Sequence, residues 1–325
     1  MFLVQFDFSL TKKTMAANIS LGSGRTSPYT ALYQVILVQV LVSVFLCINL
    51  LLISTFSRQE FFYTTMRYIL FAVTLLSDSL FLLITDIMYI LIYFRFTVQM
   101  WLCLIMCIFL SLYTFATPVT LTAMTLERYV AICRPLHHAE LCSTRKAVHC
   151  ILIIHCISSV PFIVIFSIFI DSAAHSFYTE NSKCIIDIFI VHKWQSHLWS
   201  AISQFYFLIM CIVIVCCYFK IMKVAKGASG ENKHLSWKGL RTVALHAFQL
   251  LLGLIQLWCP FIEAFVIQIN FAMYVNVKYF DYIVFVLAPR CLSPLIYGLR
   301  DDRYFRALKH YVLCGMYQTL SENLF

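Results

Sequence analysis

Residues 101–129, WLCLIMCIFLSLYTFATPVTLTAMTLERY, decide the class of this protein, because the first 26 of them carry no charged side chain. A helix that crosses a bilayer needs about 20 mostly apolar residues, since the hydrocarbon core is about 30 Å thick and each residue rises about 1.5 Å. The run at 101–126 meets this requirement and ends at Glu127 and Arg128. A continuous run of this length indicates a helix, because barrel strands alternate over only about ten residues.

Six further apolar runs lie outward from this one in both directions. They cover about 30–55, 66–93, 146–170, 197–222, 240–269 and 279–299. The chain of 325 residues is 62% hydrophobic and 12% charged, whereas soluble domains average about 45–50% apolar and about 25% charged residues. This composition excludes a soluble globular protein and predicts an all-α membrane protein, a seven-transmembrane helix bundle.

Several other classes of protein are also disfavoured. The net charge of +9 does not indicate nucleic-acid binding, because the basic residues lie between the apolar runs and form no single patch. Most of the 14 cysteines lie inside apolar runs, where a free cysteine behaves as a small hydrophobe. No repeat with matching broken helices indicates a transporter, and no catalytic cluster indicates a membrane enzyme. We expect no cofactor and no metal ion.

The distribution of lysine and arginine predicts the orientation, because these residues concentrate in cytoplasmic loops. One side of a seven-span chain carries 16 of them and the other carries 7, with Arg290 left inside the last run. The N-terminus is therefore expected outside and the C-terminus in the cytoplasm. We expect an extracellular tail at 1–29, a seven-helix domain at 30–300, and a cytoplasmic amphipathic helix with a tail at 301–325. The sequon at Asn18 falls outside, where glycosylation can occur.

Single polar residues and prolines are spread along the chain, one set per span. They are Asn49, Asp78, Cys103, Glu127-Arg128-Tyr129, Trp258-Cys259-Pro260 and Pro294-Leu295-Ile296-Tyr297. In this order and spacing they resemble the signature of rhodopsin-like (class A) G-protein-coupled receptors. The stretches MTLERYVAICRPLHH at 124–138 and SPLIYGLRD at 293–301 are similar to odorant receptors of the fish type. Ser293 departs from that family, which usually has Asn before the proline of the seventh helix.

The resemblance implies a plasma-membrane receptor, not an enzyme, that binds a small odorant-like molecule and activates a heterotrimeric G protein. It implies a disulfide between Cys103 and Cys184, both on the outer side. It also implies a switch at the inner membrane boundary, in which Glu127 holds Arg128 at rest. The tyrosines expected to rearrange with this switch are Tyr129, Tyr218 and Tyr297. The simpler alternative is that Arg128 only extends its charge to the membrane surface.

Prolines inside the third, sixth and seventh spans are expected to bend these helices, since proline supplies no backbone N–H. They are Pro118, Pro260 and Pro294. The resemblance further implies a pocket in the outer half of the bundle, with Trp258 at its floor or, alternatively, as a bulky core residue. The expected pocket residues are Cys107, Leu110, Ser111, Thr114, Tyr206, Trp258, Phe261, Ile262 and Phe265. Their apolar character suits a small, largely hydrophobic ligand.

Charged residues inside the spans are expensive and therefore informative. Asp86 and Glu263 either select a cationic ligand group or pair internally. Arg290 is not part of the general receptor pattern; we expect it to pair with Asp78, in place of the sodium ion that the resembled family holds there, or with backbone carbonyls and water. Cys314 follows the amphipathic stretch and is a candidate for palmitoylation.

Two other functions stay open at this point. The receptor could take a ligand that is not an odorant, or the chain could be a seven-span transporter or channel. The lipid bilayer is an expected partner and nucleic acid is not. The oligomeric state is left open.

Overall fold

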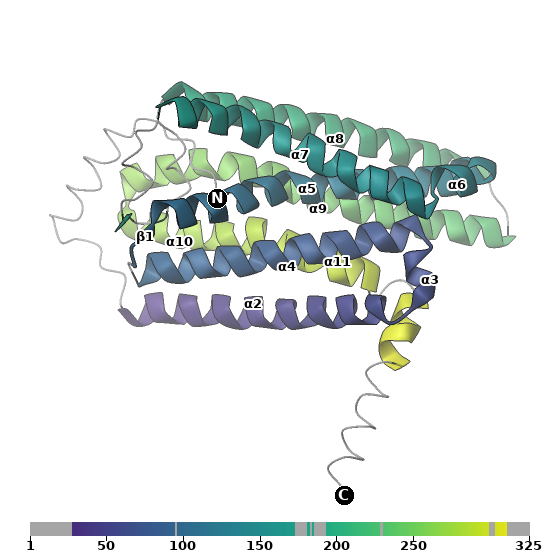
Figure 1. The fold of residues 1–325 in the computed structure, drawn as a ribbon, viewed down its shortest axis with the longest axis horizontal. Helices are drawn as coiled ribbons and strands as arrows, with labels where there is room; N and C mark the ends of the chain where they lie inside the picture. Colours follow the sequence, from purple (N-terminus) through teal and green to yellow (C-terminus); the bar gives the residue numbers. More distant parts are fainter. Residues whose placement is uncertain are drawn as a thin grey trace, which may run out of the picture.

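The computed structural model describes residues 28–94, 96–172, 181–182, 184, 193–227, 230–298 and 303–310. Long helices run roughly side by side along one axis (Figure 1). They are α2 (Pro28–Ser57), α4 (Met66–Tyr93), α5 (Met100–Cys133), α7 (Thr144–Ser172), α8 (Lys193–Gly227) and α9 (Gly230–Ile269). A seventh rod follows as α10 (Phe271–Asp281), the π-helix η3 (Tyr282–Leu287) and α11 (Ala288–Gly298).

The apolar runs of the sequence coincide with these helices. Within the described residues, six helices are long and apolar enough to cross a membrane, and the seventh rod supplies the remaining region. Some helices extend beyond their apolar runs, as α5 does from residue 126 to Cys133, whereas α4 coincides with its run. Hydropathy therefore locates each helix well but can underestimate its length, because polar residues can continue a helix outside the lipid.

The third membrane helix, α5, is the centre of the bundle. It contacts α4, α7, α8 and α9, and buried residues follow it from Met100 to Glu127. Its 34 residues span about 50 Å at 1.5 Å per residue. Thr120 and Thr125 return their hydroxyl hydrogen bonds to carbonyls of their own helix. These hydroxyls can therefore be buried at little cost.

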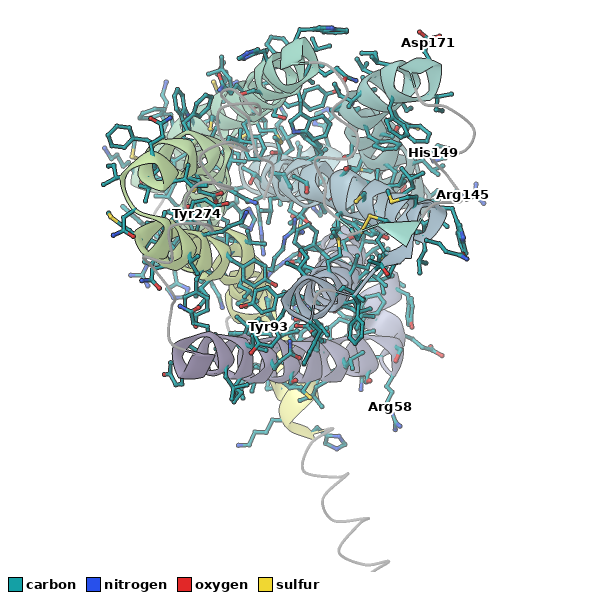
Figure 2. All side chains as sticks on the ribbon, turned by 90° about the vertical axis from the view of Figure 1, so that its left-hand side faces the viewer. Arg58, Tyr93, Arg145, His149, Asp171 and Tyr274 are labelled. Carbon is teal, nitrogen blue, oxygen red and sulfur yellow. A yellow bond between two sulfur atoms is a disulfide. The ribbon has the colours of Figure 1, made fainter. Side chains whose placement is uncertain are left out.

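The outer helices expose apolar side chains to the surroundings. Ile36 on α2 is 52% exposed, Ile153 on α7 is 56% exposed and Phe205 on α8 is 60% exposed. Figure 2 looks along the bundle and shows side chains projecting from the helices around its rim. So much exposed apolar surface would aggregate in water, whereas lipid tails solvate it. The surface thus fits a protein embedded in a bilayer.

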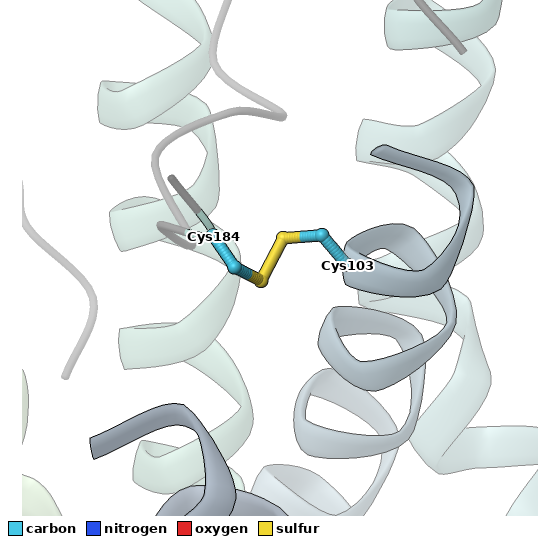
Figure 3. Close-up of a disulfide and its surroundings, with 2 residues drawn as sticks. All are labelled: Cys103 and Cys184. Carbon is cyan, nitrogen blue, oxygen red and sulfur yellow. A yellow bond between two sulfur atoms is a disulfide. The ribbon is translucent and has the colours of Figure 1, made fainter. Parts of the chain in front are cut away.

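One end of the bundle, here called the disulfide end, is closed by a short strand pair. The strand β1 (Val98–Gln99) pairs antiparallel with β2 (Asn181–Ser182). Directly after these strands Cys103, in the first turn of α5, is bonded to Cys184, as Figure 3 shows. The two Cα atoms are 5.4 Å apart. The expected disulfide is therefore present and ties the segment at Cys184 to the central helix.

The opposite end, here called the α6 end, carries two short helices and a third helical segment. They are α3 (Glu60–Tyr63), α6 (Pro135–Leu141) and residues 303–310. All three gather at the same end of the bundle in Figure 1. Tyr304 is 1% exposed and stacks on Phe62, with ring centroids 4.9 Å apart. Its hydroxyl donates to the Leu52 carbonyl of α2, so the segment after the seventh rod is fastened to the bundle.

The prolines expected to bend their helices do not interrupt them. Pro118, Pro260 and Pro294 all lie inside continuous helices. The one irregular segment of the seventh rod is instead η3, which ends seven residues before Pro294. A π-helical turn widens the backbone and commonly marks a functional site.

The disulfide predicts a non-additive pair of variants. Cys103→Ala and Cys184→Ala should each reduce surface delivery, because the bond closes a loop of 81 residues and removes roughly 4 kcal/mol of denatured-state entropy. The double variant should be no worse than either single one. Cell-surface labelling measures this.

The control for this experiment is Cys107. Its sulfur lies within 4.8 Å of the sulfurs of Cys103 and Cys184, so it can replace a missing partner. Cys107→Ala alone should preserve delivery, and the other variants should also be made in that background. Additive losses from Cys103 and Cys184 in that background would contradict the bond.

Candidate functional site

A buried ion pair joins the seventh rod to α4. The Nη1 atom of Arg290 on α11 lies 2.7 Å from the Oδ1 atom of Asp78 on α4. Asp78 is fully buried and Arg290 is 8% exposed. An isolated charge at this depth would be very costly, so each residue requires the other.

The guanidinium group also contacts α5. The Thr117 hydroxyl donates to Asp78 Oδ1 at 3.1 Å and accepts from Arg290 Nη1. Nη2 of Arg290 donates to the Tyr113 carbonyl at 3.1 Å, and the guanidinium carbon lies 4.0 Å from the ring centroid of Phe81. Both of the arrangements expected for Arg290, an acid partner and a backbone carbonyl, thus occur together. One side chain joins α4, α5 and α11.

These contacts test whether a sodium ion fits beside Asp78. The oxygens nearest to such an ion would be those of Asp78 and Thr117. Arg290 Nη1 already donates to Asp78 Oδ1 and to the Thr117 hydroxyl, and its positive charge would repel a second cation beside this carboxylate. The residues present therefore do not fit a sodium ion.

A cavity lies directly beside the ion pair, between α4, α5, α8, α9 and the seventh rod. Its unfilled space is about 820 Å³, a figure that includes the open space at its mouth. It is lined by Phe81, Thr114, Thr117, Pro118, Leu121, Trp199, Ser200, Ser203, Phe207, Gln249, Leu250, Gly253, Gln256, Leu257, Phe285, Val286, Pro289 and Arg290. The cavity is thus lined mainly by apolar side chains with a few polar groups among them.

This cavity is deeper in the bundle than the pocket expected from the sequence. Of the expected residues on α5, Thr114 lines it, whereas Cys107, Leu110 and Ser111 are buried nearer the disulfide end. Thr114 is 11 residues past Cys103, or about 16 Å along the helix. Tyr206 packs on Phe115 of α5 and donates its hydroxyl to the Ile157 carbonyl of α7.

The expectation for Trp258 is wrong in this structure. Trp258 is 54% exposed, Ile262 50% and Phe265 65%, so these side chains face the surroundings of the bundle and not the cavity. Phe261 is half-buried and lies against Trp258, with ring centroids 5.6 Å apart. Each residue of a helix turns by about 100°, and Leu257, one position earlier, is the residue that lines the cavity.

The cavity-facing residues of α9 carry a signal that sequence reasoning missed. Gln249, Leu250, Gly253, Gln256 and Leu257 are spaced by one, three and four residues and share one face. The two glutamines are seven residues apart inside an apolar run. Amide side chains at that spacing indicate a face turned away from lipid, because lipid cannot satisfy their hydrogen bonds.

The two acids of the outer half have internal partners. Asp86 Oδ1 accepts a hydrogen bond from Gln39 Nε2 at 2.6 Å. Glu263 is 6% exposed, and its Oε2 atom lies 3.9 Å from the Lys278 ammonium. Of the alternatives left by the sequence, the structure thus favours internal pairing over the selection of a cationic ligand.

The expected switch lies at the α6 end. Glu127 is 6% exposed; its Oε2 lies 3.9 Å from Arg128 Nε, and its Oε1 lies 3.1 Å from His138 Nε2 of α6. The Tyr129 ring lies under the Lys220 ammonium at 5.4 Å, and the ring of Tyr218 belongs to the same hydrophobic core. Glu127 is thus shared between the central helix and α6.

A thiol beside Glu127 has a shifted pKa. Cys142, between α6 and α7, is half-buried, and burial together with the Glu127 charge raises its pKa to about 11. The thiol is therefore protonated at neutral pH and is a poor nucleophile. Cys142 acts as a packing residue of this end of the bundle.

Two contacts that sequence reasoning did not single out hold α9 against α5 near the switch. Thr125 Oγ1 lies 2.9 Å from His246 Nδ1, and both residues are fully buried. At Gly239, an added Cβ atom would collide with the side-chain end of Ile132. The two helices thus approach closely on either side of Glu127 and Arg128.

Some expected residues lie outside the described part of the chain. These are Asn18 and Cys314, and the side chains of Tyr297, Ser293 and Pro260. Asn49 of α2 and Pro294 of α11 are both buried in the bundle.

Comparison with known proteins gives the family. Residues 48–297 match the family described as 7 transmembrane receptor (rhodopsin family). The chain belongs to this family. Odorant receptor 131-2 of Danio rerio is 41% identical over 301 residues, covering 93% of this chain and 92% of the relative. Olfactory receptor 4K15 of Homo sapiens is 28% identical over 224 residues, covering 66% of this chain and 65% of the relative.

This membership settles several expectations at once. The seven helical rods form the helix bundle of a rhodopsin-family receptor, a multi-pass protein of the plasma membrane and not an enzyme. The likeness to fish odorant receptors expected from residues 124–138 and 293–301 is confirmed by the zebrafish relative.

The ion pair predicts a partial rescue. Asp78→Asn or Arg290→Gln alone should destabilise the receptor by about 3–5 kcal/mol, because each leaves one buried charge uncompensated. The double variant, which carries neither charge, should recover part of the loss. Melting of the purified receptor in detergent measures this, and replacing sodium by choline should not change the wild-type melting temperature.

The matched control is Asp171→Asn, at the exposed end of α7 (Figure 2), which should leave melting unchanged. The two charges act independently if the double variant loses as much stability as the two single variants together. Stabilisation of the wild type by sodium would also contradict the pair.

Proposed function

We propose that this chain is an odorant receptor that binds a small, largely hydrophobic ligand in the helix bundle and activates a heterotrimeric G protein of the stimulatory or olfactory type, which raises cAMP. Its support is the 41% identity to a zebrafish odorant receptor and a largely apolar cavity inside the bundle. The observation that carries the proposal is that cavity and switch share one helix. Leu121 lines the cavity, and Arg128 follows seven residues later on α5, about 10 Å away.

The proposed orientation places the disulfide end outside and the α6 end in the cytoplasm. The 16 to 7 distribution of basic residues supports it. A disulfide also requires an oxidising compartment, and the Cys103–Cys184 bond lies at the end assigned to the outside. In this orientation Asn18 is glycosylated, residues 303–310 lie as an amphipathic helix at the inner leaflet, and Cys314 is palmitoylated.

In the proposed mechanism the ligand shifts an equilibrium between two arrangements of the α6 end. A ligand can do this only by binding one arrangement more tightly than the other. In the resting arrangement Glu127 holds Arg128 and His138, and His246 holds α9 against α5 at Thr125. Movement of α9 away from α5 breaks the His246 contact and opens a surface beside Arg128 for the G protein.

The experiments below distinguish an odorant receptor from two other functions. A receptor for a non-odorant ligand would give the same cAMP response with a different class of compound. A transporter or channel would move solute or ions without any G protein.

Signalling should depend on Arg128. In cells that express the receptor and a cAMP reporter, a panel of small neutral organic compounds should contain agonists, and Arg128→Ala should abolish the response while surface expression persists. Arg145→Ala, an exposed arginine at the same end, is the matched control and should respond normally. Ion flux without a G protein would reverse the proposal.

Basal signalling should rise without any ligand when α9 is pushed away from α5. Gly239→Val places side-chain atoms where the end of Ile132 now lies, so it should raise cAMP several-fold in the absence of agonist. Adding Ile132→Ala, which removes the colliding atom, should return basal cAMP toward the wild-type level. Equal basal cAMP in all three receptors would contradict the proposed movement of α9.

A further inference from the structure

The ion pair described above forms one wall of the cavity, and this determines which ligands the cavity can accept. Arg290 is the one charged residue among those that line the cavity in the described structure. Its charge is compensated by Asp78 at 2.7 Å. The wall is therefore polar and rich in donors, yet its net charge is zero.

Zero net charge disfavours ionic ligands. A carboxylate placed beside Arg290 would compete with Asp78 and leave one negative charge uncompensated in a buried site. An ammonium group would meet the guanidinium first, since Asp78 is fully buried and absent from the lining. Both ions would lose their hydration without gaining a counter-charge.

Hydrogen-bond donors for a neutral ligand are present at the same wall. A guanidinium has five N–H groups, and the contacts with Asp78, Thr117 and Tyr113 use three of them. Arg290 makes no further hydrogen bond within the described residues and keeps 8% of its surface exposed. Two of its donor groups therefore have no acceptor among the described residues, and Arg290 lines the cavity.

Several other polar side chains of the cavity donate to backbone carbonyls of the protein. Thr114 and Ser203 donate their hydroxyl hydrogens to the carbonyls of Leu110 and Trp199 on their own helices. Gln249 Nε2 donates to the Pro289 carbonyl at 2.9 Å. These hydrogens are used within the protein, and the guanidinium is the strongest donor of the lining because it carries a positive charge. The rest of the lining is largely aromatic and aliphatic, including Phe207, Leu250, Leu257 and Phe285.

We propose that the cavity binds a neutral amphiphile whose carbonyl oxygen accepts hydrogen bonds from Arg290 and whose apolar body packs on α8, α9 and η3. Ketones, aldehydes and esters belong to this class; carboxylates and amines are rejected by the neutral ion pair. The inference rests on the proposed function only in taking this cavity as the ligand site.

The first experiment compares head groups on equal chains. Alkanes, methyl ketones, carboxylates and primary amines with hexyl, octyl and decyl chains are added to the purified wild-type receptor, and the melting temperature gives the apparent affinity. The ketone of the best chain length should bind at least about tenfold more tightly than its three counterparts. The same compounds are tested for cAMP in cells.

The second experiment changes the charge of the wall. Asp78→Asn keeps the shape of the side chain but leaves Arg290 without its counter-charge, so the carboxylate should now bind about tenfold more tightly than the ketone. The order of the two compounds is therefore reversed relative to the wild type. The carboxylate should also restore part of the stability that this variant loses, because it replaces the missing negative charge.

A third variant tests the cavity without touching the ion pair. A Cβ atom at Gly253 would lie 2.8 Å from Phe207 Cε1, so Gly253→Ala should push that ring into the cavity and weaken ketone binding about tenfold. Gly227→Ala, where an added Cβ meets nothing within 4 Å, is the control and should bind as the wild type does. This comparison remains decisive if Asp78→Asn does not fold.

The outcomes separate the inference from the proposed function. The inference is overturned if the wild type prefers carboxylates or amines, even if cAMP still rises. It is equally overturned if Gly253→Ala leaves ketone binding unchanged. It is also overturned if the Asp78→Asn variant folds and still binds the ketone more tightly than the carboxylate. A ketone that stabilises the wild type, with the expected changes in the variants but no cAMP response, supports the inference and contradicts the proposed function.

Discussion

The arrangement of the inner bundle depends on one guanidinium group. Arg290 lies in the membrane-spanning region, where a lone cation cannot remain, and its partners come from two other helices: Asp78 of α4, and Thr117 and Tyr113 of α5. Moving any one of these helices would expose or separate a buried charge. The pair therefore fixes the relative positions of α4, α5 and α11 more strictly than apolar packing alone, since apolar side chains can slide while a charged contact cannot.

The sequence predicts the parts of this fold that follow from hydrophobicity and from the cost of charge. Helix positions follow from the apolar runs, because lipid leaves the backbone no other way to satisfy its hydrogen bonds. The partnership of Arg290 and Asp78 follows from the same cost, since few acids are available at that depth. The disulfide came from the family resemblance, which places Cys103 and Cys184 on the same side.

The rotation of α9 could not be predicted in the same way. In a soluble helix the polar face shows which side turns outward, but a membrane helix is apolar on both sides. Trp258, Ile262 and Phe265 are as suitable for lipid as for a pocket, and the structure turns them to the outside. The deciding residues are the less conspicuous ones, Gln249 and Gln256, whose amides require a polar neighbourhood. The position of the cavity therefore follows from where polar atoms can be satisfied.

Because the counter-charge of Asp78 is a side chain of α11, it restricts which helices can move. A bound ion can leave its carboxylate when helices rearrange, whereas Arg290 is part of α11 and stays beside Asp78 unless the backbone itself shifts. With α4, α5 and α11 held as one unit, the opening proposed for the α6 end would involve a helix outside that unit. α9 lies outside this unit, and its contacts with α5 near the switch include the hydrogen bond between His246 and Thr125 and the close approach of Gly239 and Ile132. Breaking these two contacts separates no buried charges, whereas moving α11 would separate Arg290 from Asp78.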